Sequence, residues 1–158
     1  MSAGGGAAAP EVTVGVVSFS AAGDEVAARV AAALRACPAP WGDARVTTLA
    51  CHGAGHERLE AWVGRTFGAA RALVFVGAAG IAVRAVAPHV ASKATDPAVL
   101  AVDEAATWVV PLLSGHLGGA NELARSLAAR LGAQAVVTTA TDVRGVWSPD
   151  DWARREGL

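Results

Sequence analysis

Several common residue types are scarce in this sequence. Among its 158 residues there is no tyrosine, and lysine, isoleucine and asparagine occur once each, as Lys93, Ile81 and Asn121. All other basic residues are arginines. A strong compositional bias disfavours these residue types, so the few that remain mark positions where a substitute would not serve. All three lie between residues 81 and 121, and we expect functional residues in that stretch.

Membrane-type runs, targeting signals and a basic excess are also lacking. No apolar run approaches the roughly 18 residues of a membrane-spanning helix, and the start of the chain lacks the basic flank and apolar core of a secretory signal. The formal net charge of −1 gives no basis for binding nucleic acid or an anionic membrane. Cys37 and Cys51 have no disulfide-type context, so we expect reduced thiols in a cytoplasmic protein.

Apolar residues are abundant, at 53% of the sequence against 17% charged residues. This balance excludes disorder for most of the chain, and the length suits one domain. The Gly/Ala-rich residues 1–10 are expected to form a flexible tail. Residues 11–158 are expected to form a single α/β domain.

Strand-type and helix-type runs alternate along that domain, which predicts a three-layer α/β sandwich around a mostly parallel, Rossmann-like sheet. A polar link at 103–106 predicts one antiparallel hairpin over 99–113. The expected strands cover residues 12–19, 45–51, 72–76, 99–102, 108–113 and 135–138. The expected helices cover residues 23–36, 57–67, 81–87, 118–131 and 149–155.

Glycines and polar residues follow three of these strands, at 77–84, 114–121 and 139–142. Ligands of open α/β sheets bind beyond the carboxyl ends of the strands. We therefore predict that the three segments converge on one edge of the sheet.

The segment after the third strand is a glycine-bearing turn into a helix. Gly77 and Gly80 permit close backbone approach, and the first amides of the helix can hold an anion, with Arg84 nearby. The alternative is a tight turn without a ligand. The segment is neither a GxGxxG nor a GK[ST] motif, so a generic nucleotide- or phosphate-binding domain is only a third hypothesis.

The next segment, KATDP, holds the single lysine. Lys93 offers a compact ammonium group to a carboxylate-bearing ligand, or is simply a solvated loop cation. Asp96 either contacts the ligand or caps the Asp-Pro turn.

The richest segment is SGHLGGAN, at 114–121. His116 is titratable and suits acid–base chemistry, although a structural hydrogen-bonding role is equally consistent with the sequence. Ser114 lacks a nucleophile elbow, so we favour a hydrogen-bond donor over a nucleophile. Gly118 and Gly119 would let a large flat ligand press against the backbone.

Two further groups have two interpretations each. Thr139 and Asp142 in TTATD are either a polar rim of the same crevice or a capped strand end. Cys51, His52 and His56 lie close together, but no fourth ligand is nearby, so we favour no metal site.

Four segments, in this order and spacing, closely resemble the N-terminal region of the cobalamin-biosynthesis protein CbiG family: GIAVR at 80–84, KATDPAV at 93–99, LLSGHLGGANELA at 112–124 and TTATD at 138–142. That family is cobalt-precorrin-5A hydrolase of the anaerobic vitamin B12 pathway. The resemblance spans about residues 73–142 and implies a cobalt-bearing macrocycle with a δ-lactone and many carboxylates as substrate. The implied reaction opens the lactone with water and releases acetaldehyde, giving cobalt-precorrin-5B.

Within that reaction we hypothesise that His116 activates water or relays its proton. Ser114, Asn121 and the amides of Gly118 and Gly119 would hold the oxyanion or the substrate. Lys93 and Arg84 would pair carboxylates, with the remaining substrate contacts expected at Gly77, Gly80, Asp96, Thr139 and Asp142. No cofactor bound by the protein is expected, because the substrate carries the cobalt.

Full-length members of the family continue into further segments and a C-terminal domain. The competing hypothesis is therefore a non-catalytic module that binds a corrinoid intermediate and acts with a C-terminal partner chain or another enzyme of the pathway. A homo-oligomer is also compatible with the sequence.

Overall fold

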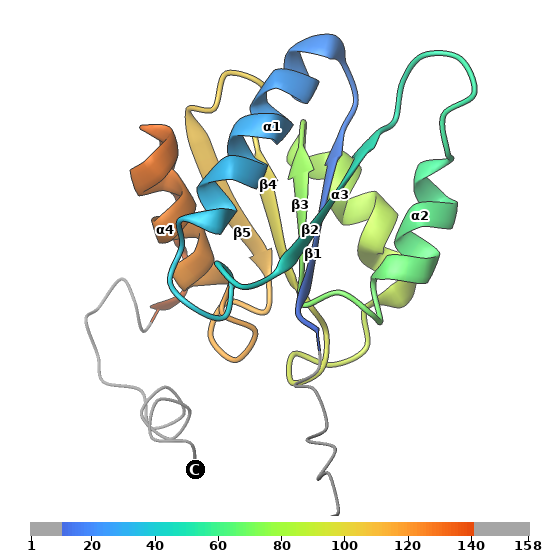
Figure 1. Cartoon of the computed structure of the whole chain (residues 1–158). Coiled ribbons are helices and arrows are strands. Elements are labelled where there is room, and N and C mark those ends of the chain that lie inside the picture. Colours follow the sequence, from blue (N-terminus) through green and yellow to red (C-terminus); the bar gives the residue numbers. More distant parts are fainter. Residues whose placement is uncertain (1–10, 141–158) are drawn as a thin grey trace, which may run out of the picture.

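The computed structural model describes residues 11–140 and shows a twisted sheet with helices on both faces (Figure 1). The expected tail at 1–10, Asp142 and the expected helix at 149–155 lie outside the described residues. The strands are β1 (Thr13–Ser18), β2 (Arg45–Ala50), β3 (Ala72–Val76), β4 (Ala98–Val102), β5 (Trp108–Leu113) and β6 (Gln134–Ala135). The helices are α1 (Ala21–Arg35), α2 (Leu59–Thr66), α3 (Ala79–Val86), a short 3-10 turn (Ala87–His89) and α4 (Ala120–Leu131).

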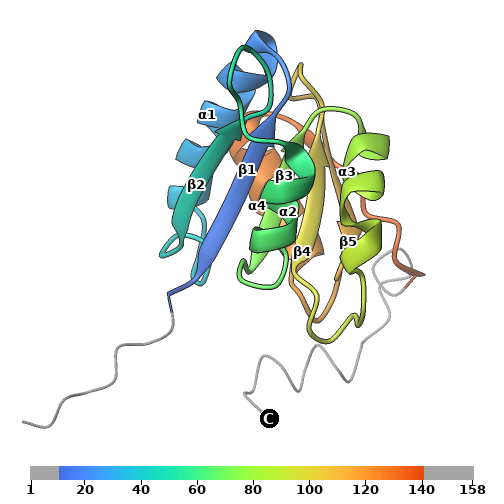
Figure 2. The ribbon, with the colours of Figure 1, turned by 90° about the vertical axis from the view of Figure 1, so that its right-hand side faces the viewer.

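The elements form three layers, which confirms the predicted sandwich. Helices α1 and α4 cover one face of the sheet, and α2 and α3 cover the other (Figure 2). Each face has its own core, because the central strands β1, β3 and β4 are buried on both sides. Val14 and Val16 of β1 pack toward α1 and α4, whereas Val17 packs with Trp62 of α2 on the other face.

The strand order is β2-β1-β3-β4-β5-β6, and four of the five neighbouring pairs are parallel. The one antiparallel pair is β4–β5, as expected from the short polar link between them. Strands β5 and β6 therefore run opposite to the other four. We call the edge where β1–β4 end the carboxyl edge, and the edge where they begin the amino edge.

The predicted convergence of three strand ends on one edge is wrong. In the β4–β5 register Val99 faces Leu113 and Val102 faces Val109, so β5 ends beside the start of β4. The segment that follows β5 consequently lies at the amino edge. The segment that follows β3 lies at the carboxyl edge, where the Gly77 amide donates to the Val102 carbonyl at 2.8 Å. The segment after β3 and the segment after β5 are therefore separated by the length of a strand.

Smaller differences concern the ends of elements. The third helix covers Ala79–Val86 rather than 81–87, and Pro88 lies within the 3-10 turn that follows it. Strand β6 has two residues rather than the expected four. The Val136 amide still donates to Val109, after which the chain leaves the sheet and Thr139 hydrogen-bonds to helix α4.

Candidate functional site

Three of the four predicted segments meet at the amino edge. They are the loop at 91–97 before β4, the crossover at 114–119 between β5 and α4, and the residues that follow β6. The Ser114 hydroxyl donates to the Asp96 carbonyl at 3.0 Å. The Asn121 Nδ2 donates to Thr139 Oγ1, also at 3.0 Å. Two side-chain hydrogen bonds thus join three segments that are far apart in the sequence.

The crossover is a tight, strained turn. Ser114 has φ of 60°, in the left-handed region that costs a non-glycine residue about 1–2 kcal/mol. A Cβ on Gly118 would lie 2.3 Å from the Ser114 Cβ, and one on Gly115 would lie 2.9 Å from Asn121 Oδ1. The glycines are therefore required by the packing of the turn itself.

The first amides of α4 close this turn. Those of Ala120 and Asn121 donate to the carbonyls of Ser114 and Gly115, each at 3.1 Å, and the Gly119 amide donates to the His116 carbonyl. The Gly119 amide is thus used within the turn, and its expected part in holding an oxyanion stays a prediction. The hydrogen bonds from these three amides to backbone carbonyls fix the shape of the crossover.

The side chains of the crossover differ in exposure. Asn121 is 3% exposed and is one of two buried polar residues among those described, the other being Ser18. A buried amide must be hydrogen-bonded, and Asn121 uses its bond to fix Thr139 beside the helix. Ser114 and His116 are half-buried, at the surface of the same turn.

The loop at 91–97 is organised by Asp96. Its Oδ2 accepts from the amides of Ala91 and Ser92 at 2.9 and 3.1 Å. The turn-capping alternative is therefore the role that the structure shows for this carboxylate. Lys93 is exposed at the tip of the loop, where its ammonium group can reach a ligand in solvent.

A hollow of about 330 Å³ lies beside these segments. Arg71 is part of its wall, and the guanidinium carbon stands 5.8 Å from the centre of the Trp41 ring. Arg71 directly precedes β3, at the opposite end from the carboxyl ends of strands where ligands were expected, so no sequence signal pointed to it. The lining residues are Ala70, Arg71, Ala94, Thr95, Asp96, Pro97, Leu117 and Gly118.

The remaining predicted contacts are elsewhere. A Cβ on Gly77 would lie 3.0 Å from the Phe19 ring at the carboxyl edge, and Gly80 is open to solvent in the first turn of α3. Arg84 is exposed near the end of α3, where it lines a separate hollow of about 280 Å³ with Leu59. The structure does not bring these three residues together with Ser114.

The Cys51, His52 and His56 segment also has no metal arrangement. The Cys51 thiol donates to the Glu57 carbonyl at 3.5 Å, and His56 Nδ1 hydrogen-bonds to the Gly53 carbonyl at 2.8 Å. His52 contacts Asp24 instead. Among residues 11–140 no three His, Cys, Asp or Glu side chains gather as metal ligands would.

The fold is that of a doubly wound α/β domain, with polar loops at both ends of its sheet. The chain belongs to the family described as cobalamin synthesis G N-terminal, whose model matches residues 61–142. That range includes every segment that forms the amino-edge site, together with Arg71.

Similar proteins agree with this assignment. A cobalt-precorrin-5A hydrolase of Salmonella typhimurium is 56% identical over 82 residues, and that of Priestia megaterium is 44% identical over 87 residues. The matches cover 52% and 55% of this chain but only 23% of each relative. A crystal structure of a cobalamin biosynthesis protein G homologue from Sulfolobus solfataricus superposes with a TM-score of 0.65 at 26% identity, covering 80% of this chain and 36% of that one.

Within the described residues, no helix is both long and apolar enough to cross a membrane.

Proposed function

We propose that this chain acts in cobalamin synthesis as the N-terminal part of a cobalt-precorrin-5A hydrolase. The observation that carries the proposal is the family match over 61–142, which coincides with the site at the amino edge. The relatives named for this activity are about four times longer than the matched region. In those relatives further segments accompany the matched region, and we propose that segments of that kind complete the activity.

The chemistry of the amino edge suits an anionic macrocycle. Lys93 and Arg71 would pair carboxylate side chains of the substrate. The hollow of about 330 Å³ is at the lower end of the range for small-molecule pockets, roughly 300–1,000 Å³. It would therefore hold one edge of the macrocycle, and the further segments would cover the rest.

The reaction would begin with hydrolysis of the δ-lactone. His116 would take a proton from water while the water oxygen attacks the lactone carbonyl, and the ring C–O bond then breaks to give a carboxylate and a hydroxyl group. Loss of the hydroxyl proton would form a C=O bond as the neighbouring C–C bond breaks, releasing acetaldehyde. The electron pair of that bond, with a proton, would remain on the macrocycle to give cobalt-precorrin-5B.

Ser114 and Asn121 would act as positioning residues for His116. Ser114 ties the crossover to the loop of Lys93 through its bond to Asp96, and Asn121 fixes the residues after β6. The substrate brings the cobalt, so no resident cofactor is proposed. We further propose a cytoplasmic location, in keeping with the two free cysteines.

The test is an acetaldehyde assay with cobalt-precorrin-5A, with and without a C-terminal partner chain. General acid–base groups contribute roughly 10²–10⁴-fold, so His116→Gln is expected to lower release at least about 100-fold. His56→Gln, in a distant exposed loop, is the matched control and should retain full activity. Near-normal turnover of His116→Gln would refute the role of His116. Tight corrinoid binding without release, even with the partner, would favour the non-catalytic module.

A further inference from the structure

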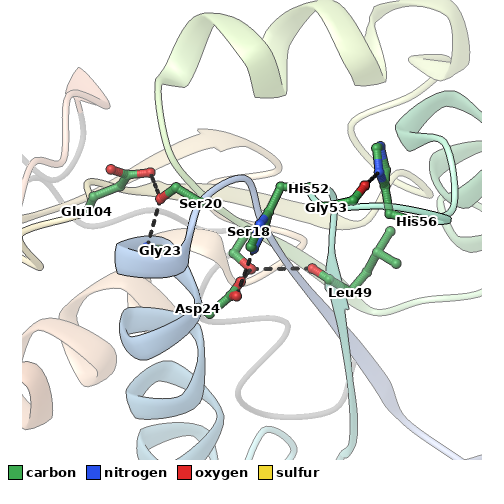
Figure 3. A network of polar contacts seen from close by, with 9 residues as sticks. All are labelled: Ser18, Ser20, Gly23, Asp24, Leu49, His52, Gly53, His56 and Glu104. Carbon is green, nitrogen blue, oxygen red and sulfur yellow. Dashed lines mark hydrogen bonds and ion pairs between the residues drawn. The ribbon is translucent and has the colours of Figure 1, made fainter.

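A chain of three hydrogen-bonded side chains lies at the carboxyl edge, at the other end of the sheet from the site above (Figure 3). The Ser18 hydroxyl, at the end of β1, donates to Asp24 Oδ1 at 2.6 Å. Asp24 Oδ2, in the first turn of α1, contacts His52 Nε2 at 2.7 Å. His52 lies in the loop that follows β2. Both carboxylate oxygens are thus engaged, and the histidine is held from one side.

The protonation states follow from these contacts. The hydrogen bonds from Ser18 and His52 lower the pKa of Asp24, so its carboxylate is ionised at neutral pH. An ionised carboxylate only accepts hydrogen bonds, so Nε2 of a neutral His52 carries the proton. The lone pair of the neutral ring is then on Nδ1, which has no hydrogen-bond partner among residues 11–140. The side chain of His52 is 32% exposed, so solvent reaches the ring.

The pair lies beyond the carboxyl ends of β1 and β2, beside the point where the strand order reverses between β1 and β3. Strand β1 lies between β2 and β3, so the chain leaves β1 toward one neighbour and later returns on the other side. The crevice beyond the carboxyl ends of such strands is the usual ligand site. At the same edge, the hydroxyl of Ser20, the N-cap of α1, donates to Glu104 in the link between β4 and β5 (Figure 3).

A histidine whose one nitrogen is held by a carboxylate and whose other nitrogen is available is the arrangement of a general base. Asp24 fixes both the tautomer and the orientation of the ring. Ser18 is 2% exposed, so it supports the carboxylate and is not itself a nucleophile. His56, four residues further on, has no carboxylate partner among the described residues and bonds only to a backbone carbonyl.

We propose that His52, oriented by Asp24, is the general base of a second site that hydrolyses a small ester at the carboxyl edge. His52 Nδ1 takes a proton from water as the water oxygen attacks the ester carbonyl. The C–O bond of the tetrahedral intermediate then breaks, and the proton passes from His52 to the departing alkoxide, leaving an acid and an alcohol. No oxidant or reductant is needed.

This site is independent of the proposed hydrolase reaction. The five residues of β3 span about 16 Å, so a small ligand at one edge does not reach the groups at the other. The test likewise needs neither a corrinoid nor a partner chain. Its result therefore leaves the proposed function untouched, and the acetaldehyde assay leaves this inference untouched.

The experiment measures hydrolysis of p-nitrophenyl acetate by the full chain, followed by release of p-nitrophenolate. His52→Gln is expected to lower the rate at least tenfold, and Asp24→Asn at least threefold. The matched control His56→Gln should stay within twofold of the unsubstituted chain, because an exposed imidazole without a carboxylate adds little. A rate for His52→Gln within twofold of the unsubstituted chain overturns the proposal.

A second measurement does not depend on any variant. Two-bond ¹H–¹⁵N NMR correlations report which ring nitrogen of a neutral histidine carries the proton. We expect His52 to be protonated at Nε2 and unprotonated at Nδ1, and to lose this preference in Asp24→Asn. A His52 ring protonated mainly at Nδ1 in the unsubstituted chain refutes the assignment of Nδ1 as the base.

Discussion

Replacing Gly118 with alanine should distort the crossover at the amino-edge site and destabilise the fold. The added Cβ would lie 2.3 Å from the Ser114 Cβ and 2.8 Å from the Ser114 carbonyl oxygen. Carbon atoms pack at about 3.5–4.0 Å, so the two chain segments must separate by more than about 1 Å. Such a shift disrupts the hydrogen bonds from the amides of Ala120 and Asn121, which close the turn at 3.1 Å.

The cost can be worked from these contacts. Overpacking contributes about 1–3 kcal/mol, and weakening two hydrogen bonds contributes about 1 kcal/mol each. We expect a total loss of about 3 kcal/mol in the free energy of unfolding, because the turn relaxes in part. For a domain of this size that corresponds to a fall in Tm of about 10 °C. The assay is urea unfolding followed by the fluorescence of the five tryptophans.

Gly64→Ala in α2 is the matched control. The nearest atom to its added Cβ is His89 Cε1 at 4.0 Å, and alanine is favoured over glycine inside a helix by about 0.5–1 kcal/mol. The two glycine-to-alanine changes should therefore shift stability in opposite directions. A Gly118→Ala variant within about 0.5 kcal/mol of the unsubstituted chain would refute the reasoning.

Three further variants test other parts of the fold. Asn121→Ala should cost about 1–3 kcal/mol in urea unfolding, because it removes the buried amide that holds Thr139; an unchanged midpoint would contradict this. Gly15→Ala should cost about 1–3 kcal/mol, since the new Cβ would lie 2.7 Å from the buried ring of Trp62, and unperturbed tryptophan fluorescence and stability would argue against it. The folded-state pKa of Asp24 is lowered, so its ionised form contributes stability above its ordinary pKa of about 3.9, and this stability is lost as pH falls through the folded value. Asp24→Asn should therefore be less stable than the unsubstituted chain at pH 7 and approach it below about pH 4; a gap independent of pH would refute this.

The layers of the fold and most of its elements follow from the sequence, because buried strands alternate with amphipathic helices at clear intervals. The β4–β5 hairpin was also predictable, since the link between the strands is far shorter than the dozen or so residues that a parallel crossover needs. The predicted convergence of three strand ends was wrong because it overlooked the consequence of this hairpin. A hairpin reverses the chain, so the residues after Leu113 must lie beside the start of β4.

The contents of the sites were less accessible from the sequence. Ser114 and Asp96 are 18 residues apart in the sequence, and His52 and Asp24 are 28 residues apart. No short sequence motif predicts either pair. Nothing in the sequence distinguishes Arg71 from other surface arginines. Only the structure shows that it lies beside Trp41 and the 94–97 loop. Side-chain partnerships of this kind depend on register and strand order, which hydrophobic periodicity does not encode.

The central position of β1 has a consequence for how the family's sequence relates to its fold. The family match begins at residue 61, yet β3, which lies within it, pairs along its whole length with β1, from Val14 beside Ala72 to Ser18 beside Val76. A fragment cut at the start of the match would expose an apolar five-residue edge that invites pairing with other chains. The limit of sequence similarity is thus not a limit of folding. The matched half of this chain therefore depends on a strand that precedes it in the sequence.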